Sequence, residues 1–431
     1  MNPPMYRLVC SSSSSSLFAF SLNNRIFPFR RNFPSAIGAP VVTMAIGGFD
    51  ELRDTFSVNV ARAEGRPLNV PLVAPFTIAS SRLDTVGNVA LRVELRCGSV
   101  GWGGPVLPSV TAEDQPTALA AASAVCDFLT HSPPMALGPL LEEIASHLPG
   151  HDFASIRAGI EMALIDAVAN SIHIPLWTLF GGASRSLITD ITIPIVAPKE
   201  AAELAAKYKK RGFNILKLKV GKNLSSDIEV LSAIRQVHPF CRFILDANEG
   251  YTTNEAIEVL EKLNDESCRG LDDAKRIIDG NLAHVINIKL AKLGVLGALD
   301  VIEVARAAGT ELMIGGMVET RLAMGFAGHL AAGLGCFKYV DLDTPLLLSD
   351  DPVIGGYEVS SLPGLNQETC DGYPSHLFLC VRIASTRRFQ IVGGNHVIML
   401  KNSVVCCVEL AHQFQRGVST GGAELDVMPR I

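Results

Sequence analysis

A repeated alternation of short apolar runs with helical stretches constrains the fold of this 431-residue chain more than any other feature. The runs are rich in β-branched residues, and their spacing is that of a strand followed by a helix. Such repeats build parallel strands joined by helical crossovers, and the closed (β/α)8 barrel is the commonest array of this kind. Six runs fit the pattern: 188–197, 214–221, 242–250, 285–292, 311–316 and 338–344. A complete barrel needs eight.

The alternation breaks between the third and fourth runs. One helical apolar pattern ends at Leu263 and another begins at Leu271, and the few residues between them are too short for a strand with its loops. The sequence therefore predicts an α/β fold with a barrel domain over 184–360 that is interrupted near 263–265 and lacks about one βα unit.

A different pattern precedes the barrel runs. Residues 88–95 alternate apolar with polar side chains like a half-buried strand, whereas 117–129 and 155–170 are helical by spacing and composition. We expect an N-terminal α+β capping domain over 44–183. Beyond the barrel, residues 361–431 do not continue the alternation, and the sequence assigns no role to this divergent tail.

Composition narrows the classes of partner. The formal net charge is −6 and the Lys and Arg residues are scattered, so the chain has no basic stripe for nucleic acid and no polybasic membrane patch. Its ten cysteines contain no C-x-x-C pair, which argues against a zinc site or a disulfide framework. We expect a small-molecule ligand, no nucleic acid and no membrane; a homo-oligomer is compatible with these features.

The first 49 residues contain no Asp or Glu, but they carry four arginines and the serine run 11–16. This composition is typical of an organellar transit peptide, which we place at 1–43. We therefore expect chloroplast localisation. The alternatives are the mitochondrion, a Ser-rich tail on a cytoplasmic protein, or initiation at Met44.

Lysines occur inside runs that are ordinarily apolar in a buried parallel strand. Lys217 and Lys219 are two residues apart, so their side chains point to one face while Leu218 points to the helix layer. Two lumen-facing ammonium groups cost several kcal/mol unless they are paired or used, and each lowers the pKa of the other, which suits a lysine base. The alternative is that these two lysines lie on an exposed edge strand. Lys289 is a third strand-borne lysine.

Acidic residues follow several of the same runs. Asp246 and Asp265 come at positions that belong to the catalytic face if the runs are barrel strands, and Asp341 and Asp343 are two apart on the last run, facing one way. With little His or Cys nearby, converging carboxylates suit a hard cation such as Mg²⁺. Alone, Asp246 could equally be a turn or N-cap residue.

Together these motifs resemble the enolase superfamily, and within it the plant-like dipeptide epimerases of the L-Ala-D/L-Glu epimerase type. The resemblance covers about residues 50–360, and its carriers are KLK at 217–219, DANEG at 246–250, DES at 265–267, IKLAK at 288–292, GGMVET at 315–320, DLDTP at 341–345 and the linker helix at 160–182. It implies an enolase-superfamily barrel with a capping domain, a Mg²⁺ cofactor, and isomerase activity: epimerisation of dipeptides by 1,1-proton transfer through an enediolate.

The resemblance also implies residue roles. Lys219 and Lys289 would be acid/base catalysts on opposite faces of the substrate, and Lys217 would hold the carboxylate whose charge grows in the enediolate. The other implied site residues are the metal ligands Asp246 and Asp265, the pair Asp341 and Asp343 for the α-ammonium of the dipeptide, the lumen contacts Thr192 and Met317, and the capping loop 75–82.

The chain departs from the family pattern at its interruption. In the family, a Glu at the end of the fourth barrel strand lies between the two metal-binding Asp residues, which are much further apart than Asp246 and Asp265 are here. The missing length equals about one βα unit. We infer that the fourth strand, its helix and most of the fifth strand are absent, together with the middle metal ligand, and that activity is impaired.

Two other functions stay open. A lyase or cycloisomerase of the o-succinylbenzoate synthase or muconate cycloisomerase type would keep the same lysines, but its acidic substrates offer no ammonium group to Asp341 and Asp343. A non-catalytic isoform is favoured by the missing strand and is not contradicted by the retained lysines and aspartates. The sequence does not identify the preferred dipeptide.

Overall fold

A computed structural model describes residues 48–77, 82–104, 114–247, 268, 270–280, 283–361, 379–383 and 390–391. The chain divides into a unit of residues 1–45 and a unit of residues 46–431, and every described residue lies in the second. The predicted transit peptide, the metal ligand Asp265 and the helix end at Leu263 therefore lie outside the described residues.

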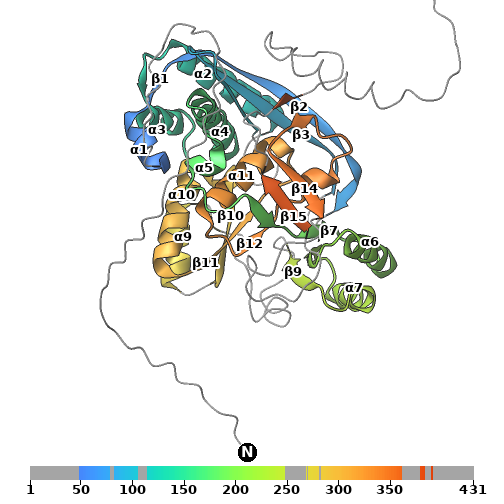
Figure 1. Cartoon of the computed structure of the whole chain (residues 1–431). Helices are drawn as coiled ribbons and strands as arrows, with labels where there is room; N and C mark the ends of the chain where they lie inside the picture. Colours follow the sequence, from blue (N-terminus) through green and yellow to red (C-terminus); the bar gives the residue numbers. More distant parts are fainter. Residues whose placement is uncertain are drawn as a thin grey trace, which may run out of the picture. The chain divides into compact units, whose positions relative to one another are not determined.

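The N-terminal elements have the mixed α and β composition expected of a cap (Figure 1). A long antiparallel hairpin of β2 (Val60–Thr77) and β3 (Arg82–Leu95) is extended by β4 (Val100–Gly103), and α2 (Gln115–His131) and α4 (Ala154–Ser171) pack against this sheet. The remaining elements here are α1 (Gly48–Thr55), β1 (Ser57–Val58), β5 (Met135–Ala136), α3 (Leu137–His147) and α5 (Leu176–Leu179).

Helix α4 lies against β4 at very short range. Every residue from Ala154 to Ala169 except Arg157 is buried, which explains why apolar residues occur on all sides of the helix instead of on one face. Strand β4 approaches it through glycines: a methyl group added to Gly103 would overlap the carbonyl oxygen of Gly159. The absence of a side chain at Gly103 is therefore a packing requirement.

Each of the six predicted runs contains a parallel strand. Strands β7 (Ile191–Ile193), β8 (Ile215–Lys219) and β9 (Arg242–Asp246) form one sheet, and β10 (Val285–Lys289), β11 (Glu311–Gly315) and β12 (Tyr339–Val340) form another. The accompanying helices are α6 (Pro198–Lys210), α7 (Leu224–Val237), α9 (Leu271–Asp279), α10 (Leu290–Ala308) and α11 (Arg321–Leu334). Helix α9 begins at the predicted residue.

The two parallel sheets meet along a seam between β7 and β12. The Asp190 N–H donates to the Val340 carbonyl at 3.1 Å, and the Leu342 N–H donates to Thr189 Oγ1 at 3.0 Å. The apolar side chains form two separate clusters: one contains β7, β8, α6 and α7, and the other contains β10, β11, α10 and the cap. The seam is therefore a polar junction between two apolar cores.

The strands β9 and β10 lie at the ends of the two parallel sheets that are away from this seam. Within the described ranges, β9 pairs with β8 alone and β10 pairs with β11 alone. These are the strands that flank the predicted interruption in the sequence. An edge of this kind presents unpaired backbone groups, which a closed barrel would satisfy.

Segments after β12 return to other parts of the chain. A 3-10 helix (Thr344–Leu347) follows, then β13 (Val353–Ile354) pairs with β16 (Gln390–Ile391), and β15 (Leu379–Ile383) pairs with β14 (Tyr357–Ser361) and with β6 (Ser186–Ile188). Among its described residues, the divergent tail thus contributes the short strands β15 and β16. None of the helices in the described ranges is long and apolar enough to cross a membrane.

The contact between β4 and α4 predicts opposite effects for two Gly-to-Ala substitutions. Gly103→Ala should lower the free energy of unfolding by about 1–3 kcal/mol or more, because the helix backbone cannot yield. Gly297→Ala in α10 is the control: its added methyl group lies 4.0 Å from Leu293 Cβ, and alanine favours a helix interior by about 0.5–1 kcal/mol. Urea denaturation measures both. Equal stability of the two variants would contradict this packing.

Candidate active site

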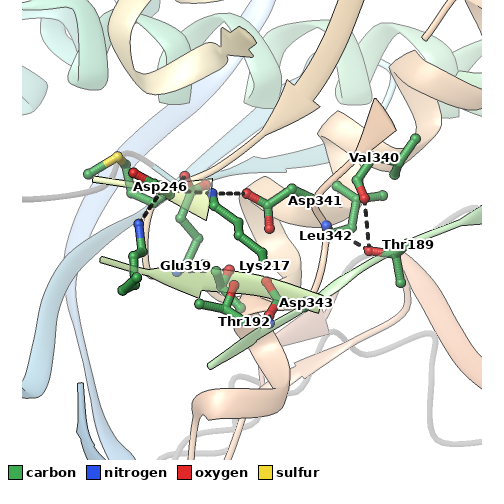
Figure 2. A network of polar contacts seen from close by, with 12 residues as sticks. Thr189, Thr192, Lys217, Asp246, Glu319, Val340, Asp341, Leu342 and Asp343 are labelled. Carbon is green, nitrogen blue, oxygen red and sulfur yellow. Dashed lines mark hydrogen bonds and ion pairs between the residues drawn. The ribbon is translucent and has the colours of Figure 1, made fainter. Parts of the chain in front are cut away.

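Lys217 lies at the centre of a buried ion-pair chain (Figure 2). Its Nζ atom donates to Asp341 Oδ2 at 2.7 Å and lies 3.1 Å from Asp246 Oδ2. The three side chains are at most 5% exposed. Buried charges are tolerated only when each has a partner, and this arrangement supplies partners from β8, β9 and the segment after β12.

Lys219 shares Asp246 with Lys217. Its Nζ atom lies 2.5 Å from Asp246 Oδ2, so the two lysines occupy the same face of β8, while Leu218 packs among the apolar residues of α6 and α7. Burial, and then the charge of Lys217, lower the pKa of Lys219, whereas Asp246 opposes that shift. Burial alone would raise the pKa of Asp246, but the surrounding lysines hold it well below its usual range.

Lys289 ends β10 and is 4% exposed. Its charge acts on Lys219 and on Asp246, so the three predicted lysines surround one lumen. Glu319, in the turn after β11, accepts a hydrogen bond from the Met317 N–H at 2.7 Å. Burial raises the pKa of Glu319 to about 7, although the Met317 hydrogen bond and the charge of Lys289 lower it.

Asp341 and Asp343 lie beside the lysines, and one carboxylate oxygen of each accepts a hydrogen bond. Lys217 binds Asp341 Oδ2, and the Thr192 N–H donates to Asp343 Oδ2 at 2.5 Å. Burial, and then the charge of Asp341, raise the pKa of Asp343 to about 7. Burial would also raise the pKa of Asp341, but Lys217 holds it below its usual value. In the described part of the chain, the Oδ1 atom of each has no hydrogen-bond partner.

The structure places eight of the nine predicted site residues, and Asp265 is outside the described ranges. Asp341 and Asp343 follow the last strand instead of lying on it, since β12 ends at Val340 where the chain turns toward the 3-10 helix. Met317 is half-buried beside the site. The capping loop 75–82 is described only at its ends, where the Thr77 carbonyl accepts from the Ile195 N–H at 3.2 Å.

Sequence reasoning missed two buried acids at this site. Glu319 belongs to the quoted GGMVET segment, but it received no role. Asp190 lies within the run 188–197 and is 1% exposed. The signal that singled out Lys217 and Lys219, a charged residue inside an apolar run, applies equally to Asp190.

The carboxylates expected to bind Mg²⁺ are partly in place. Asp246 is present at the end of β9, but its Oδ2 atom is held by the two lysines. Mg²⁺ requires near-octahedral oxygen ligands at about 2.0–2.1 Å. Within the described ranges, Asp246 alone of the expected ligand pair is available, so these residues do not complete such a site.

Two family models match most of the chain outside its ends. The model described as "Mandelate racemase / muconate lactonizing enzyme, N-terminal domain" matches residues 63–181. The model described as "Enolase C-terminal domain-like" matches in two pieces, residues 200–265 and 263–365. The two pieces meet where the sequence pattern places the interruption.

A plant protein shows high sequence similarity. The L-Ala-D/L-amino acid epimerase of Populus trichocarpa is 64% identical over 351 residues, covering 72% of this chain and 83% of the relative. Because 72% of 431 residues is about 310, about 40 positions of that alignment have no residue in this chain. This length is close to one βα unit.

Solved structures share the fold. A mandelate racemase/muconate lactonizing protein from Herpetosiphon aurantiacus has a TM-score of 0.68 and 31% identity, covering 78% of this chain and 99% of that chain. A dipeptide epimerase from Cytophaga hutchinsonii, complexed with Mg and the dipeptide D-Ala-L-Val, has a TM-score of 0.66 and 27% identity, covering 70% and 91%. These likenesses confirm the predicted barrel with its N-terminal cap.

The ion-pair chain predicts a large cost for removing its central cation. Lys217→Met should lower the free energy of unfolding by about 3–5 kcal/mol, because the buried Asp341 loses its ion-pair partner and Asp246 keeps Lys219 but loses Lys217. Lys338→Met, which removes the exposed ion pair with Glu311, should change stability little. Chemical denaturation of both variants checks this. A Lys217 variant as stable as the Lys338 variant would show that the buried pairs are not made.

Proposed function

Because the chain belongs to the dipeptide epimerases of the enolase superfamily, we propose that it acts on dipeptides of the L-Ala-D/L-amino acid type by 1,1-proton transfer. The observation that carries this proposal is a set of three lysines at one site. Lys217 and Lys289 are each 4% exposed and the Lys219 side chain is 9% exposed. Lys217 is ion-paired with Asp246 and Asp341, and Lys219 with Asp246. Burying several ammonium groups costs free energy, and proton transfer next to a carboxylate is a function that explains why they are buried.

The lysines suit the two halves of the reaction. One of Lys219 and Lys289 removes the α-proton, the C–H electron pair passes into the enediolate, and the other lysine delivers a proton to the opposite face. The depressed pKa of Lys219, caused first by burial and then by Lys217, favours the neutral amine that a base requires. Lys217 supplies a fixed positive charge beside the growing negative charge.

Asp341 and Asp343 suit recognition of the substrate's free amino terminus. Each presents one carboxylate oxygen without a partner among the described residues, and both side chains are almost completely buried. A buried anionic pair favours a ligand that carries a positive charge and rejects one that does not. This supports dipeptides with a free α-ammonium over the acidic substrates of the lyase and cycloisomerase alternatives.

We also propose that the interruption weakens metal binding and turnover. Dipeptide epimerases related to this chain are solved with Mg, and Mg²⁺ is the cofactor we assign here. Two observations support the impairment: the family match splits at 263–265, and β9 and β10 each pair on one side within the described ranges. A displacement of about 1 Å at a catalytic group can already lower a rate about 100-fold.

Restoring the missing unit tests the proposal. The segment of the Populus trichocarpa relative that has no counterpart here would be inserted between Asp246 and Asp265. Exchange of the α-proton of L-Ala dipeptides with solvent deuterium would be followed by NMR in both chains at saturating Mg²⁺. The restored chain should exchange at least about 100-fold faster and should bind Mg²⁺ more tightly.

A control substitution separates catalysis from folding. Lys219→Met in the restored chain should abolish exchange while leaving the protein folded. Comparable exchange by the original and restored chains would contradict the impairment, and no exchange by either would contradict the proposed activity.

We propose that the protein is imported into the chloroplast. Support comes from the first 49 residues, which lack Asp and Glu and contain Arg7, Arg25, Arg30 and Arg31. Fused to a fluorescent reporter in plant cells, residues 1–49 should direct it to plastids, and replacing the four arginines by glutamine should reduce import. A diffuse cytosolic signal from the unmodified fusion would refute the assignment, and a mitochondrial signal would replace it.

A further inference from the structure

Asp190 is a buried carboxylate that none of the roles above uses. It precedes β7 and is 1% exposed, and among the described residues its side-chain oxygens have no partner other than the neighbouring acid Asp341. Leaving a buried carboxylate unpartnered is unfavourable, so an isolated group of this kind requires an explanation.

The position of Asp190 is fixed by the seam. Its backbone N–H donates to the Val340 carbonyl at 3.1 Å, one residue before Asp341. One carboxylate oxygen from each of Asp190, Asp341 and Asp343 lies within 4.8 Å of the other two. Lys217 acts on all three acids and Lys289 acts on Asp341, but the Lys217 Nζ atom is already shared between Asp341 and Asp246. The cluster therefore carries more acid than this chain neutralises with that lysine.

The open acceptors match the donors of one ammonium group. Asp341 Oδ1, Asp343 Oδ1 and the two oxygens of Asp190 are the unpartnered atoms, and they come from three different carboxylates. A primary ammonium group has three N–H donors. The three oxygens are separated by no more than 4.8 Å, so an atom centred among them lies at most about 2.8 Å from each, within hydrogen-bonding reach.

We propose that Asp190 is the third carboxylate of the α-ammonium site, so that the substrate's amino terminus is held by three acids instead of the two that the DLD motif supplies. This inference rests on the proposed function of Asp341 and Asp343. A bare Mg²⁺ ion is a poorer fit because its ligands lie at about 2.0–2.1 Å and it retains several waters, whereas these carboxylates are almost completely buried.

The charges around Asp190 favour a protonated carboxyl group that can lose its proton when a cation binds. Burial, and then the charges of Asp341 and Asp343, raise the pKa of Asp190 well above its usual value, whereas Lys217 lowers it. As a protonated acid, Asp190 can share its proton with the neighbouring Asp341. Binding of the ammonium group would release that proton, because the incoming charge stabilises all three carboxylates.

Two ligands that differ only at the amino terminus test the assignment. L-Ala-L-Ala carries the α-ammonium group, and propionyl-L-alanine has the same skeleton with hydrogen in its place. Dissociation constants for both would be measured by titration calorimetry on the full chain, on Asp190→Asn and on Asp166→Asn. Asp166 is a buried carboxylate of α4 that accepts from the Trp102 N–H and is separate from this cluster.

Asp190→Asn should weaken binding of L-Ala-L-Ala at least about tenfold, because a hydrogen bond between charged groups is lost, and should leave propionyl-L-alanine unchanged. Asp166→Asn should keep the preference for L-Ala-L-Ala. If Asp190→Asn does not fold, Asp190→Ser replaces it.

Three results would overturn the inference. If the Asp190→Asn variant keeps the preference for L-Ala-L-Ala, Asp190 is not part of the ammonium site, and the roles of Asp341 and Asp343 are unaffected. Equal weakening of both ligands gives Asp190 a merely structural role. No preference in the unmodified chain rejects the ammonium site as a whole, and with it the proposed function of Asp341 and Asp343.

Discussion

The contact on which the rest of the site depends is the position of one ammonium group, that of Lys217, between Asp246 and Asp341. The two parallel sheets have separate apolar cores, so hydrophobic packing within each core does not by itself fix one sheet against the other. Directional polar contacts along the β7–β12 seam do so: backbone bonds at Asp190 and Leu342, the Thr192 bond to Asp343, and the Lys217 pair.

This arrangement explains how a catalytic constellation can persist in an interrupted barrel. Lys217 on β8 and Asp341 after β12 pair across the seam, whereas the proposed metal ligand Asp246 ends β9, beside the predicted interruption. The proposed ammonium site of Asp341 and Asp343 lies at this seam, whereas Lys219 pairs with Asp246 at the end of β9, beside the interruption. The proposed metal binding and the proposed placement of Lys289 across the substrate depend on the strands β9 and β10, each of which pairs on one side within the described residues.

Several features of the fold and the site were predictable from local sequence patterns. The strand runs, the shared face of Lys217 and Lys219, and the start of α9 at Leu271 follow from periodicities that neighbouring residues determine. The tail strands β15 and β16 were not predictable, because each pairs with a segment distant in sequence. Asp190 carries the same sequence signal as Lys217, a charged residue inside an apolar run, but its proximity to Asp341 and Asp343 was not predictable, because the seam brings these distant segments together.

Amide hydrogen exchange tests most directly the proposal that the two parallel sheets are held together at the β7–β12 seam and that β9 and β10, which pair on one side within the described residues, are edge strands. Peptides covering 189–193 and 339–343 should be strongly protected, whereas β9 and β10 should exchange faster, because alternate amides of an edge strand lack partners. Inserting the missing βα unit should then protect β9 and β10. Equal protection of all four segments in the original chain would contradict the account, since it would mean that the edges flanking the interruption are already closed.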